Sequence, residues 1–396
     1  MLDLVKLAKQ LPGMSEQMKQ EALASTKRLQ KALELLNEAQ DNLAQLLEKQ
    51  QQWGDRLIFP AATPIESLDT PITIPKSPTS HSVFATDGSQ IAPSHHEIAY
   101  CYLINIGLIM LHYGQNLHPL LDSLPEIYYK PEDLYIAKQW GIRTEEWMSY
   151  KRTIAEAKAL ATIACDWVKP PGAHHEPNLA LVDGSLIYWF LETLPTEAKN
   201  LILPEIFASW AALRAGNIPL IGYISASRSR ESLSFLRLQA CTYPQSDCQR
   251  YCANLDKTPC HVTESLRDTT VWGYLLQPGE RSPLWRSNIR ILNDYNEIDR
   301  VYFCYLNVGT EIARLDIPAW VVENPPLLEQ SLSIILAQVY KGDGYPISLA
   351  EAHNQAVVKG GDRYRFFALL EKEMIRAGLK NVSISYKETS KRGSIA

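Results

Sequence analysis

Ser82-Val-Phe-Ala-Thr-Asp87-Gly-Ser89 and Leu179-Ala-Leu-Val-Asp183-Gly-Ser185 repeat one pattern, a buried strand followed by Asp-Gly-Ser. Glycine permits a sharp turn and serine can cap the next element, so each copy predicts a strand that ends at an acidic turn. In open α/β sheets, ligands bind at the edge where such strands end. Two carboxylates brought together repel each other unless a divalent cation lies between them. One Asp-Gly is an ordinary turn dipeptide, but two copies after buried runs favour a metal site at Asp87 and Asp183.

The segments around these two copies alternate between strand-like and helix-like spacing. Further strands are predicted at residues 98–112, 218–224, 301–308 and 319–322. Helices are predicted at residues 150–168, 186–194, 203–215, 328–341, 348–358 and 364–377. Strands with helices between and after them indicate an α/β domain with a mixed central sheet flanked by helices.

Residues 15–53 contain no proline or glycine and have apolar residues three and four positions apart. This spacing predicts a long amphipathic helix with a narrow apolar seam. Such a seam suits a partner helix in a coiled coil and equally suits a helix that lies on its own domain. The predicted organisation is an N-terminal helical arm over residues 1–57, a linker rich in Pro, Ser and Thr over 58–81, a globular domain over 82–382, and a flexible tail over 383–396.

Composition narrows the functional classes. Apolar residues make up 46% of the 396-residue chain, enough for a large core, and the formal net charge of -5 excludes a simple basic coat protein for nucleic acids. The first residues show no secretory signal, and no apolar stretch approaches the length of a membrane span. Seven cysteines, an odd number, predict a reduced, cytoplasmic protein.

Three further residues are weaker candidates by themselves. Glu156 lies on the helix that leads into the second acidic strand, Tyr345 precedes a late helix, and His353 lies on that helix. A helix glutamate is more often solvated, and a single helix histidine is more often structural. The residue pattern alone therefore assigns none of them a role.

The two Asp-Gly-Ser copies, the helix Glu between them and the late Tyr followed eight positions later by an Ala-His resemble the NurA family of DNA end-processing nucleases. The resemblance runs from about Phe84 to Arg376 and includes the segments 279–282 and 314–318. It implies an RNase H-like core. Two departures concern substrate contacts: Ser225-Ala-Ser-Arg228 stands where the family is expected to have a lysine, and the insert at residues 241–261 is unlike the family at large.

The resemblance implies roles residue by residue. Asp87, Glu156, Asp183 and His353 would bind Mn²⁺ or Mg²⁺, and Tyr345 would contact the phosphate. The distance along the chain between Glu156 and Asp183 is longer than expected, so Glu145 and Glu146 remain alternatives for the third carboxylate. Oxygen ligands of this kind suit both ions.

Local cations supply candidate DNA contacts, because arginine can bind two phosphate oxygens at once. The aromatic residues Trp285 and Tyr364 are candidates for stacking on unpaired bases. The predicted cationic contacts are Arg228, Arg230, Arg281, Arg286, Lys359 and Arg363.

Four cysteines fall in the insert, namely Cys241, Cys248, Cys252 and Cys260. Clustering in a loop suits structural Zn²⁺ or an iron–sulfur cluster, although the spacing matches no standard CxxC pair. Free buried thiols are the alternative.

The expected function is therefore a metal-dependent DNA nuclease, a single-strand endonuclease and 5′-to-3′ exonuclease, in the repair of double-strand breaks. Its expected substrates are single-stranded DNA and duplex ends. By resemblance its partner is a HerA-type hexameric ATPase, and it forms a homodimer in the cytoplasm, associated with the nucleoid. The alternative is a non-catalytic DNA-binding or scaffold subunit of a translocase complex.

Overall fold

The computed structural model describes residues 3–69, 71–93, 99–169 and 177–378. The predicted tail over residues 383–396 lies outside these ranges. The chain divides into two units, each described by itself below. Unit 1 contains Met1–Pro75, Gly184–Trp189 and Tyr223–Val322, and unit 2 contains Lys76–Asp183, Phe190–Gly222 and Glu323–Ala396.

The sheet of unit 2 begins with three long antiparallel strands, β3 (His81–Ile91), β4 (Tyr102–Tyr113) and β5 (Leu120–Tyr128). β6 (Asn178–Asp183) then pairs parallel to β3, and β7 (Leu220–Ile224) follows it in the order β7-β6-β3-β4-β5. Three antiparallel strands followed by a strand parallel to the first are the arrangement expected of an RNase H-like core.

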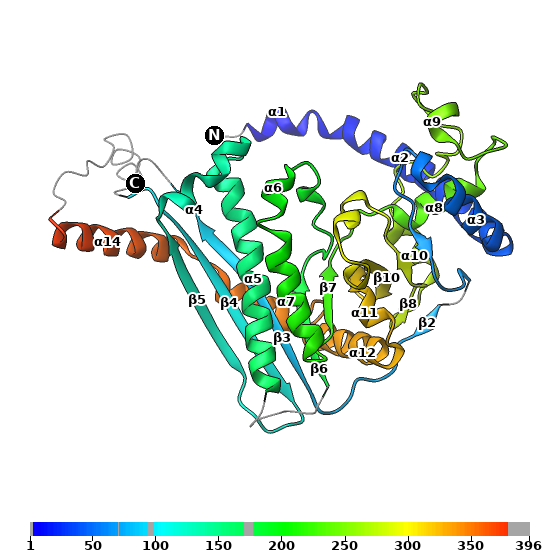
Figure 1. The fold of residues 1–396 in the computed structure, drawn as a ribbon. Coiled ribbons are helices and arrows are strands. Elements are labelled where there is room, and N and C mark those ends of the chain that lie inside the picture. Colours follow the sequence, from blue (N-terminus) through cyan, green and yellow to red (C-terminus); the bar gives the residue numbers. More distant parts are fainter. Residues whose placement is uncertain (1–2, 70, 94–98, 170–176, 379–396) are drawn as a thin grey trace. The chain divides into compact units, whose positions relative to one another are not determined.

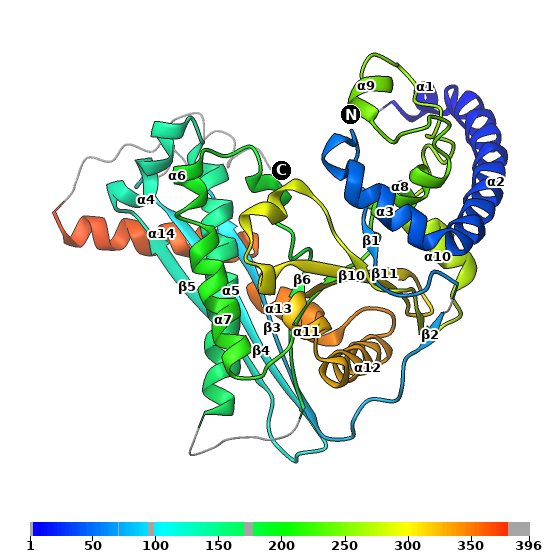
Figure 2. The same ribbon diagram turned by 45° about the vertical axis from the view of Figure 1, so that its right-hand side comes forward.

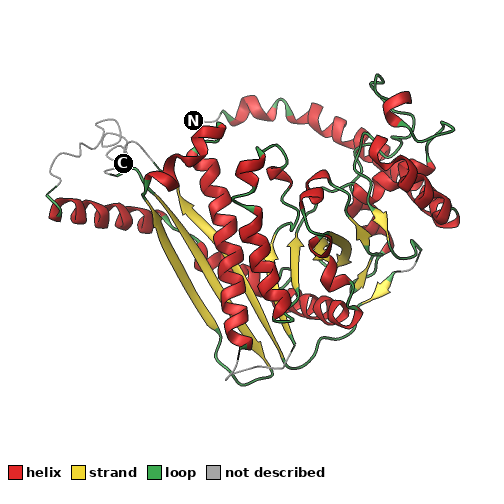
Figure 3. Cartoon of the chain, viewed as in Figure 1, coloured by secondary structure: helices red, strands yellow, loops and turns green. Residues whose placement is uncertain are grey.

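Helices cover both faces of this sheet (Figures 1 and 3). α5 (Thr144–Val168) packs against β3, β4 and α7 (Leu203–Ala215). α13 (Ile347–Ala356) packs against the same strands from the other face. The mixed α/β fold with a central mixed sheet and flanking helices is therefore confirmed. The remaining helices of unit 2 are α4 (Pro131–Tyr135), α6 (Thr196–Lys199), α12 (Pro325–Lys341) and α14 (Gly360–Arg376).

Unit 1 has a sheet of short strands with a helical layer. β1 (Thr63–Pro64), β9 (Trp285–Arg286), β10 (Val301–Asn307) and β11 (Ile312–Pro318) follow in that order, and β2 (Ile72–Thr73) pairs with β8 (Glu280–Arg281), which pairs with β10. β1 and β2 both fall within residues 58–81. The helices of this unit are α1 (Leu4–Ala8), α2 (Leu11–Asp41), α3 (Leu43–Trp53), α8 (Glu231–Gln239), α9 (Cys248–Tyr251), α10 (Asp268–Leu275) and α11 (Ala319–Val322).

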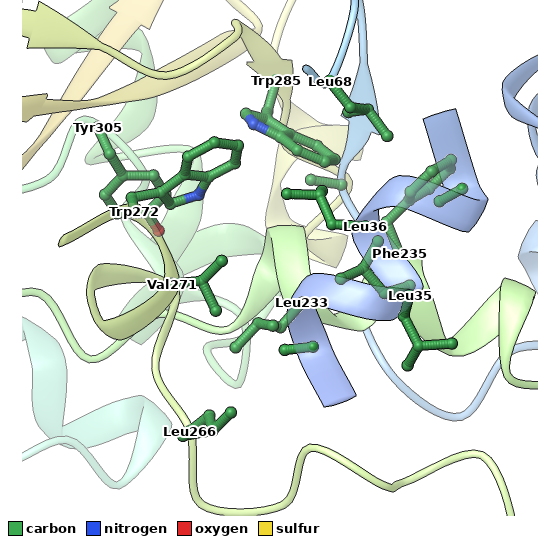
Figure 4. Close-up of a cluster of buried hydrophobic side chains, with 14 of the residues drawn as sticks. Leu35, Leu36, Leu68, Leu233, Phe235, Leu266, Val271, Trp272, Trp285 and Tyr305 are labelled. Atoms are coloured by element: carbon green, nitrogen blue, oxygen red, sulfur yellow. The ribbon is translucent and has the colours of Figure 1, made fainter. Parts of the chain in front are cut away.

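The long N-terminal helix is present but is interrupted at Asn42, whose backbone leaves the helical conformation, so it forms α2 and α3. Its seam packs on its own unit: Figure 4 shows Leu35 and Leu36 beside Leu233 and Phe235 of α8. The alternative of a helix lying on its own domain therefore holds for this half of α2. The first turns, from Leu4 to Leu23, remain exposed.

Three local expectations were wrong. Asp87 does not end a strand, because β3 continues to Ile91 and carries the first Asp-Gly-Ser in its middle. Residues 186–194 form only a single 3-10 turn, Trp189–Leu191, instead of a helix. Residues 319–322 are the helix α11 instead of a strand, because the antiparallel β10–β11 ladder ends at Pro318. Within the described ranges no helix has the length and apolarity needed to cross a membrane.

Candidate active site

The register of two neighbouring strands brings the two acidic residues together. The parallel β3–β6 ladder ends with the pair Thr86 and Val182, so Asp87 and Asp183 are the next residue on each strand. Neighbouring strands lie ~4.8 Å apart, which places both carboxylates at one edge of the ladder in unit 2. β3 continues beyond Asp87, but β6 ends at Asp183. From this point on β3 no longer has β6 beside it, so Asp87 still lies where the ladder ends.

His353 joins Asp87 because α13 lies almost directly on the strands. Its ring Nδ1 is 2.8 Å from Asp87 Oδ2. The backbone carbonyl of Ala356 accepts hydrogen bonds from Asn105 Nδ2, at 2.8 Å, and from Ser89 Oγ. These polar contacts hold α13 against β3 and β4 (Figure 2). They thereby hold His353 beside Asp87.

Two strand glycines allow the helices to approach this closely. Gly107 pairs with Asp87, and a Cβ there would meet the backbone nitrogen of Ala356 at 2.6 Å. Gly88 faces α5. A Cβ at this position would meet the Glu156 carboxylate and would lie 2.7 Å from Arg152 Cγ. Residues that alternate along a strand face opposite sides, so α13 and α5 reach this point of β3 from opposite faces.

Glu156 is the third carboxylate of the cluster. Thr86 Oγ1 donates a hydrogen bond to the Glu156 backbone carbonyl at 3.1 Å, which ties α5 to β3 at this level. Arg152 Nε lies 3.2 Å from Glu156 Oε1. Glu145 and Glu146 lie at the other end of α5, ~15 Å along its axis at 1.5 Å per residue, and Glu146 accepts a hydrogen bond from Tyr150. The geometry therefore favours Glu156.

The electrostatics reflect crowded negative charge. Burial is the largest cause that raises the pKa of Glu156 to about 7; Arg152 lowers it, and the charges of Asp87 and Asp183 add to the rise. Burial also raises the pKa of Asp183, and a hydrogen bond from Tyr345 together with His353 offsets part of this rise. These interactions link the five residues singled out from the sequence, which are called the cluster below. His353 contacts Asp87, Tyr345 contacts Asp183, and the charges of both aspartates act on Glu156.

Charge and donor type at this cluster suit a divalent cation. Three carboxylates and an imidazole are ligands for Mn²⁺ or Mg²⁺, and a cation between the carboxylates would relieve the repulsion that raises their pKa values. No three His, Cys, Asp or Glu side chains of the described residues are already arranged around one point. The fit of a cation therefore depends on the chemistry of the donors, Asp87, Glu156, Asp183 and His353.

Gly107→Ala is expected to lower the nuclease activity expected from the sequence by about 10²-fold, because the new methyl group displaces α13 and His353 by up to an ångström. It should also cost about 1–3 kcal/mol of stability through overpacking. Gly360→Ala is the matched control, since a Cβ at Gly360 meets nothing within 4 Å. Activity assays and thermal melts of the two variants check this, and an unaffected Gly107→Ala enzyme would show that the position of α13 is not critical.

The predicted DNA contacts have separate outcomes. Lys359 and Arg363, at the start of α14 in unit 2, are exposed, as are Arg228, Arg230 and Arg286 in unit 1. Arg281 is only 7% exposed, and both of its terminal nitrogens bind Glu66, at 2.7 and 2.9 Å. It faces inward, which corrects its assignment as a DNA contact. Trp285 is fully buried and cannot stack on a base.

The four insert cysteines lie near one another, and none of them forms a disulfide. Cys248, Cys252 and Cys260 are buried, and all four thiols are free. Burial, with smaller contributions from the other three cysteines, raises the pKa of Cys248 to about 11. Metals bind thiolates, and no group of three or more potential ligands suited to a metal is found in the described residues. The structure therefore leaves both expectations for these cysteines, a structural metal and free thiols, as predictions.

Sequence reasoning missed Arg152 and Gly107. Arg152 lies four residues before Glu156 on a helix, which is the spacing of a side-chain ion pair. Gly107 is a lone glycine within an apolar strand, which often marks a close backbone approach. Both signals were available in the sequence, but nothing in it showed which element would approach.

Comparison with known proteins gives one family match. The model of the family described as NurA domain matches residues 81–358, which contain all five clustered residues. A search of curated proteins finds no match. Among solved structures, the NurA nuclease of Sulfolobus solfataricus is 12% identical, with 88% of this chain and 97% of that chain covered and a TM-score of 0.46. The catalytic domain of human Endonuclease V is 12% identical, with 86% and 98% covered and a TM-score of 0.32.

Proposed function

The chain belongs to the NurA family of nucleases, and from this we propose that it is a divalent-metal-dependent deoxyribonuclease that cleaves single-stranded DNA and processes duplex ends. The observation that carries the proposal is the cluster of Asp87, Glu156, Asp183 and His353 in unit 2. A scaffold subunit would have no need of three carboxylates that repel one another.

Asp87 and Asp183 would hold the ions, and Glu156 would complete their ligands. Divalent ions supply Lewis acidity and charge neutralisation for phosphodiester hydrolysis. Tyr345 donates its hydroxyl hydrogen bond to Asp183 and favours the ionised carboxylate. His353 uses Nδ1 toward Asp87, and its side chain is 64% exposed, so Nε2 is the atom that can pass a proton to the departing 3′ oxygen.

The substrate strand would be held by cations in the same unit. Lys359 and Arg363 follow His353 by six and ten residues and are exposed at the start of α14. Charges of this kind bind phosphates without reading the sequence of bases. The net charge of -5 does not conflict with this role, because the acidic site residues contribute to it.

The test is cleavage of a 5′-labelled single strand and of a blunt duplex by the purified full chain, with Mn²⁺, Mg²⁺ or EDTA. We expect cleavage of both substrates with either ion and none in EDTA. Equal, near-zero activity of wild type and Asp87→Ala in Mn²⁺ would favour the scaffold alternative. Cleavage of a mononucleotide ester without cleavage of polymer would point to a different phosphohydrolase. The order in which labelled products appear gives the polarity, proposed to be 5′ to 3′.

The biological setting follows the family resemblance. We propose that the chain acts as a homodimer in double-strand break repair, together with a HerA-type hexameric ATPase that feeds DNA to it. The expected location is the cytoplasm, at the nucleoid. Co-purification with such an ATPase, and its stimulation of cleavage of long duplexes, test this setting independently of the chemistry.

A further inference from the structure

Unit 1 contains an open pocket of about 340 Å³ whose role is not explained by the carboxylate cluster. Its volume is at the lower end of the ~300–1,000 Å³ typical of small-ligand pockets. The segment that follows the second Asp-Gly-Ser forms one side, and the loop after β7 with the start of α8 forms another. The residues relevant here are Ser185, Trp189, Ser227, Ser229, Arg230 and Arg314.

A buried ionic network holds the floor of this pocket in place. Arg314, 4% exposed, pairs through Nε with Asp316 at 2.7 Å and through Nη1 with Glu231 at 2.7 Å. Ser185 Oγ donates a hydrogen bond to Asp316 Oδ2 at 2.6 Å. The network gives the carboxylates of Asp316 and Glu231 charged or hydrogen-bonding partners. It also links β11, α8 and the segment after Asp183. The pocket is therefore preformed, which lowers the entropic cost of binding a ligand.

The rim of the pocket combines one aromatic ring and one cation. Trp189 is 64% exposed, although it stands in a short 3-10 turn whose last residue, Leu191, is fully buried. Arg230, the residue before α8, is exposed and also lines the pocket. An aromatic face for bases together with cations for the backbone is the combination that binds single-stranded nucleic acid.

We propose that this pocket binds one unpaired nucleotide of the DNA strand, with the base stacked on Trp189 and the phosphate held by Arg230. The proposal rests on the nuclease function and names how a single strand is recognised. Trp189 lies six residues after Asp183, so the chain alone keeps the two Cα atoms within ~20 Å. Ser185, on the pocket wall, is two residues from Asp183.

This assignment differs from the aromatic contacts expected from the sequence. Trp285 is buried, and Trp189 was placed in a helix by its apolar neighbours. In the structure those neighbours, Leu186, Ile187 and Leu191, are buried, while the indole remains exposed. A single exposed apolar residue is common on protein surfaces. What distinguishes Trp189 is that it lines a preformed pocket together with Arg230.

The first test is the affinity of a fluorescein-labelled oligothymidylate for the full-length protein, measured by fluorescence anisotropy in EDTA to prevent cleavage. Trp189→Ala should weaken binding by about 5- to 100-fold, and Trp189→Phe should retain most of the affinity. Tyr274→Ala is the matched control, because Tyr274 is 66% exposed in the same unit and does not line the pocket. Trp189→Ala should weaken binding of a blunt duplex less than binding of the single strand, since the bases of the duplex are already stacked on one another.

Salt dependence separates the two contacts. Arg230→Ala should reduce the slope of log affinity against log salt by about 0.7, the value for one phosphate of a single strand. Trp189→Ala should leave this slope unchanged, because stacking releases no counterion. Photo-crosslinking of an oligonucleotide that contains 5-iododeoxyuridine, with mass mapping of the wild-type peptide, should identify Trp189 without any substitution.

The outcomes separate the pocket from the enzyme. If wild type binds the single strand, and Trp189→Ala binds as tightly as Tyr274→Ala with crosslinks mapping elsewhere, the pocket proposal is overturned while the nuclease function stands. If wild type neither binds nor cleaves a single strand, both are overturned. If Trp189→Ala lost affinity for a free mononucleotide as much as for the polymer, the pocket proposal would also be overturned. The pocket would then bind a small ligand.

Discussion

Asp183→Asn should lower cleavage of single-stranded DNA by about 10³-fold or more while the protein remains folded. The substitution keeps the shape of the side chain and removes the charge that a divalent cation needs. Asp183 sits at the open end of β6, with its carboxylate at the surface and a hydrogen bond from Tyr345. No core packing depends on it, so the loss should appear in kcat and in metal affinity.

The measurement is single-turnover cleavage in saturating Mn²⁺, with circular dichroism and thermal melts as checks of folding. Asp87→Asn should behave in the same way, because it occupies the next register position on β3. Glu145→Gln is the matched control, an exposed carboxylate on the same helix as Glu156. If Asp183→Asn cleaves within a few-fold of wild type, Asp183 does not participate in the chemistry.

Glu156→Gln is expected to have opposite effects on activity and stability. Activity should be lost, as for the aspartates. In metal-free buffer at pH 8, however, the free energy of unfolding of the variant should exceed that of wild type by about 1–3 kcal/mol. This range is an upper estimate, because the Glu156 side chain is 23% exposed and solvent screens part of its charge. The physical reason is that folding removes this carboxylate from water and, to a smaller extent, brings it near the charges of Asp87 and Asp183.

The sign follows from the pKa of Glu156, which folding raises from its ordinary value of 4.5 to about 7. Below pH 4.5 the carboxyl is protonated in both states and costs nothing. Between pH 4.5 and 7 the unfolded chain loses the proton first, so stability falls as pH rises, and the full cost is present above pH 7. Glutamine avoids this cost, so the difference between variant and wild type should vanish near pH 4.5.

Thermal melts in EDTA at several pH values measure this difference, with Glu145→Gln again as the control. Excess Mn²⁺ should raise the melting temperature of wild type at pH 8 and raise that of Glu156→Gln less, since a ligand stabilises the state that binds it. A variant that is less stable than wild type at pH 8 would mean that the Arg152 contact outweighs the repulsion from the aspartates.

The sequence predicted the fold best where a pattern repeats within a strand or helix. Long helices such as α5 and α12 begin within six residues of their expected starts, because their apolar spacing reports directly on one buried face. Residues 319–322 and 186–194 failed for a common reason. Both are short apolar runs whose conformation depends on tertiary packing, and periodicity alone cannot distinguish strand, turn and helix over such lengths.

The site was predictable as a list of residues, whereas its geometry was not. The repeated Asp-Gly-Ser pattern identifies Asp87 and Asp183. The two residues lie next to each other because of the β3–β6 register, a pairing of strands that are far apart in the sequence. The resemblance was needed to select Glu156, because its spacing alone is that of a solvated helix residue. Arg281 shows the opposite error, since charge in the sequence does not reveal a buried partner such as Glu66.

The most direct test of the carboxylate cluster is the affinity of the full chain for Mn²⁺, compared between wild type and Asp183→Asn at pH 7.5. The free Mn²⁺ in each titration is measured by electron paramagnetic resonance. Loss of one ligand carboxylate should weaken binding at least tenfold, with Glu145→Gln unchanged. Identical Mn²⁺ affinity and stoichiometry in wild type and Asp183→Asn would contradict the assignment of this cluster as the catalytic metal centre.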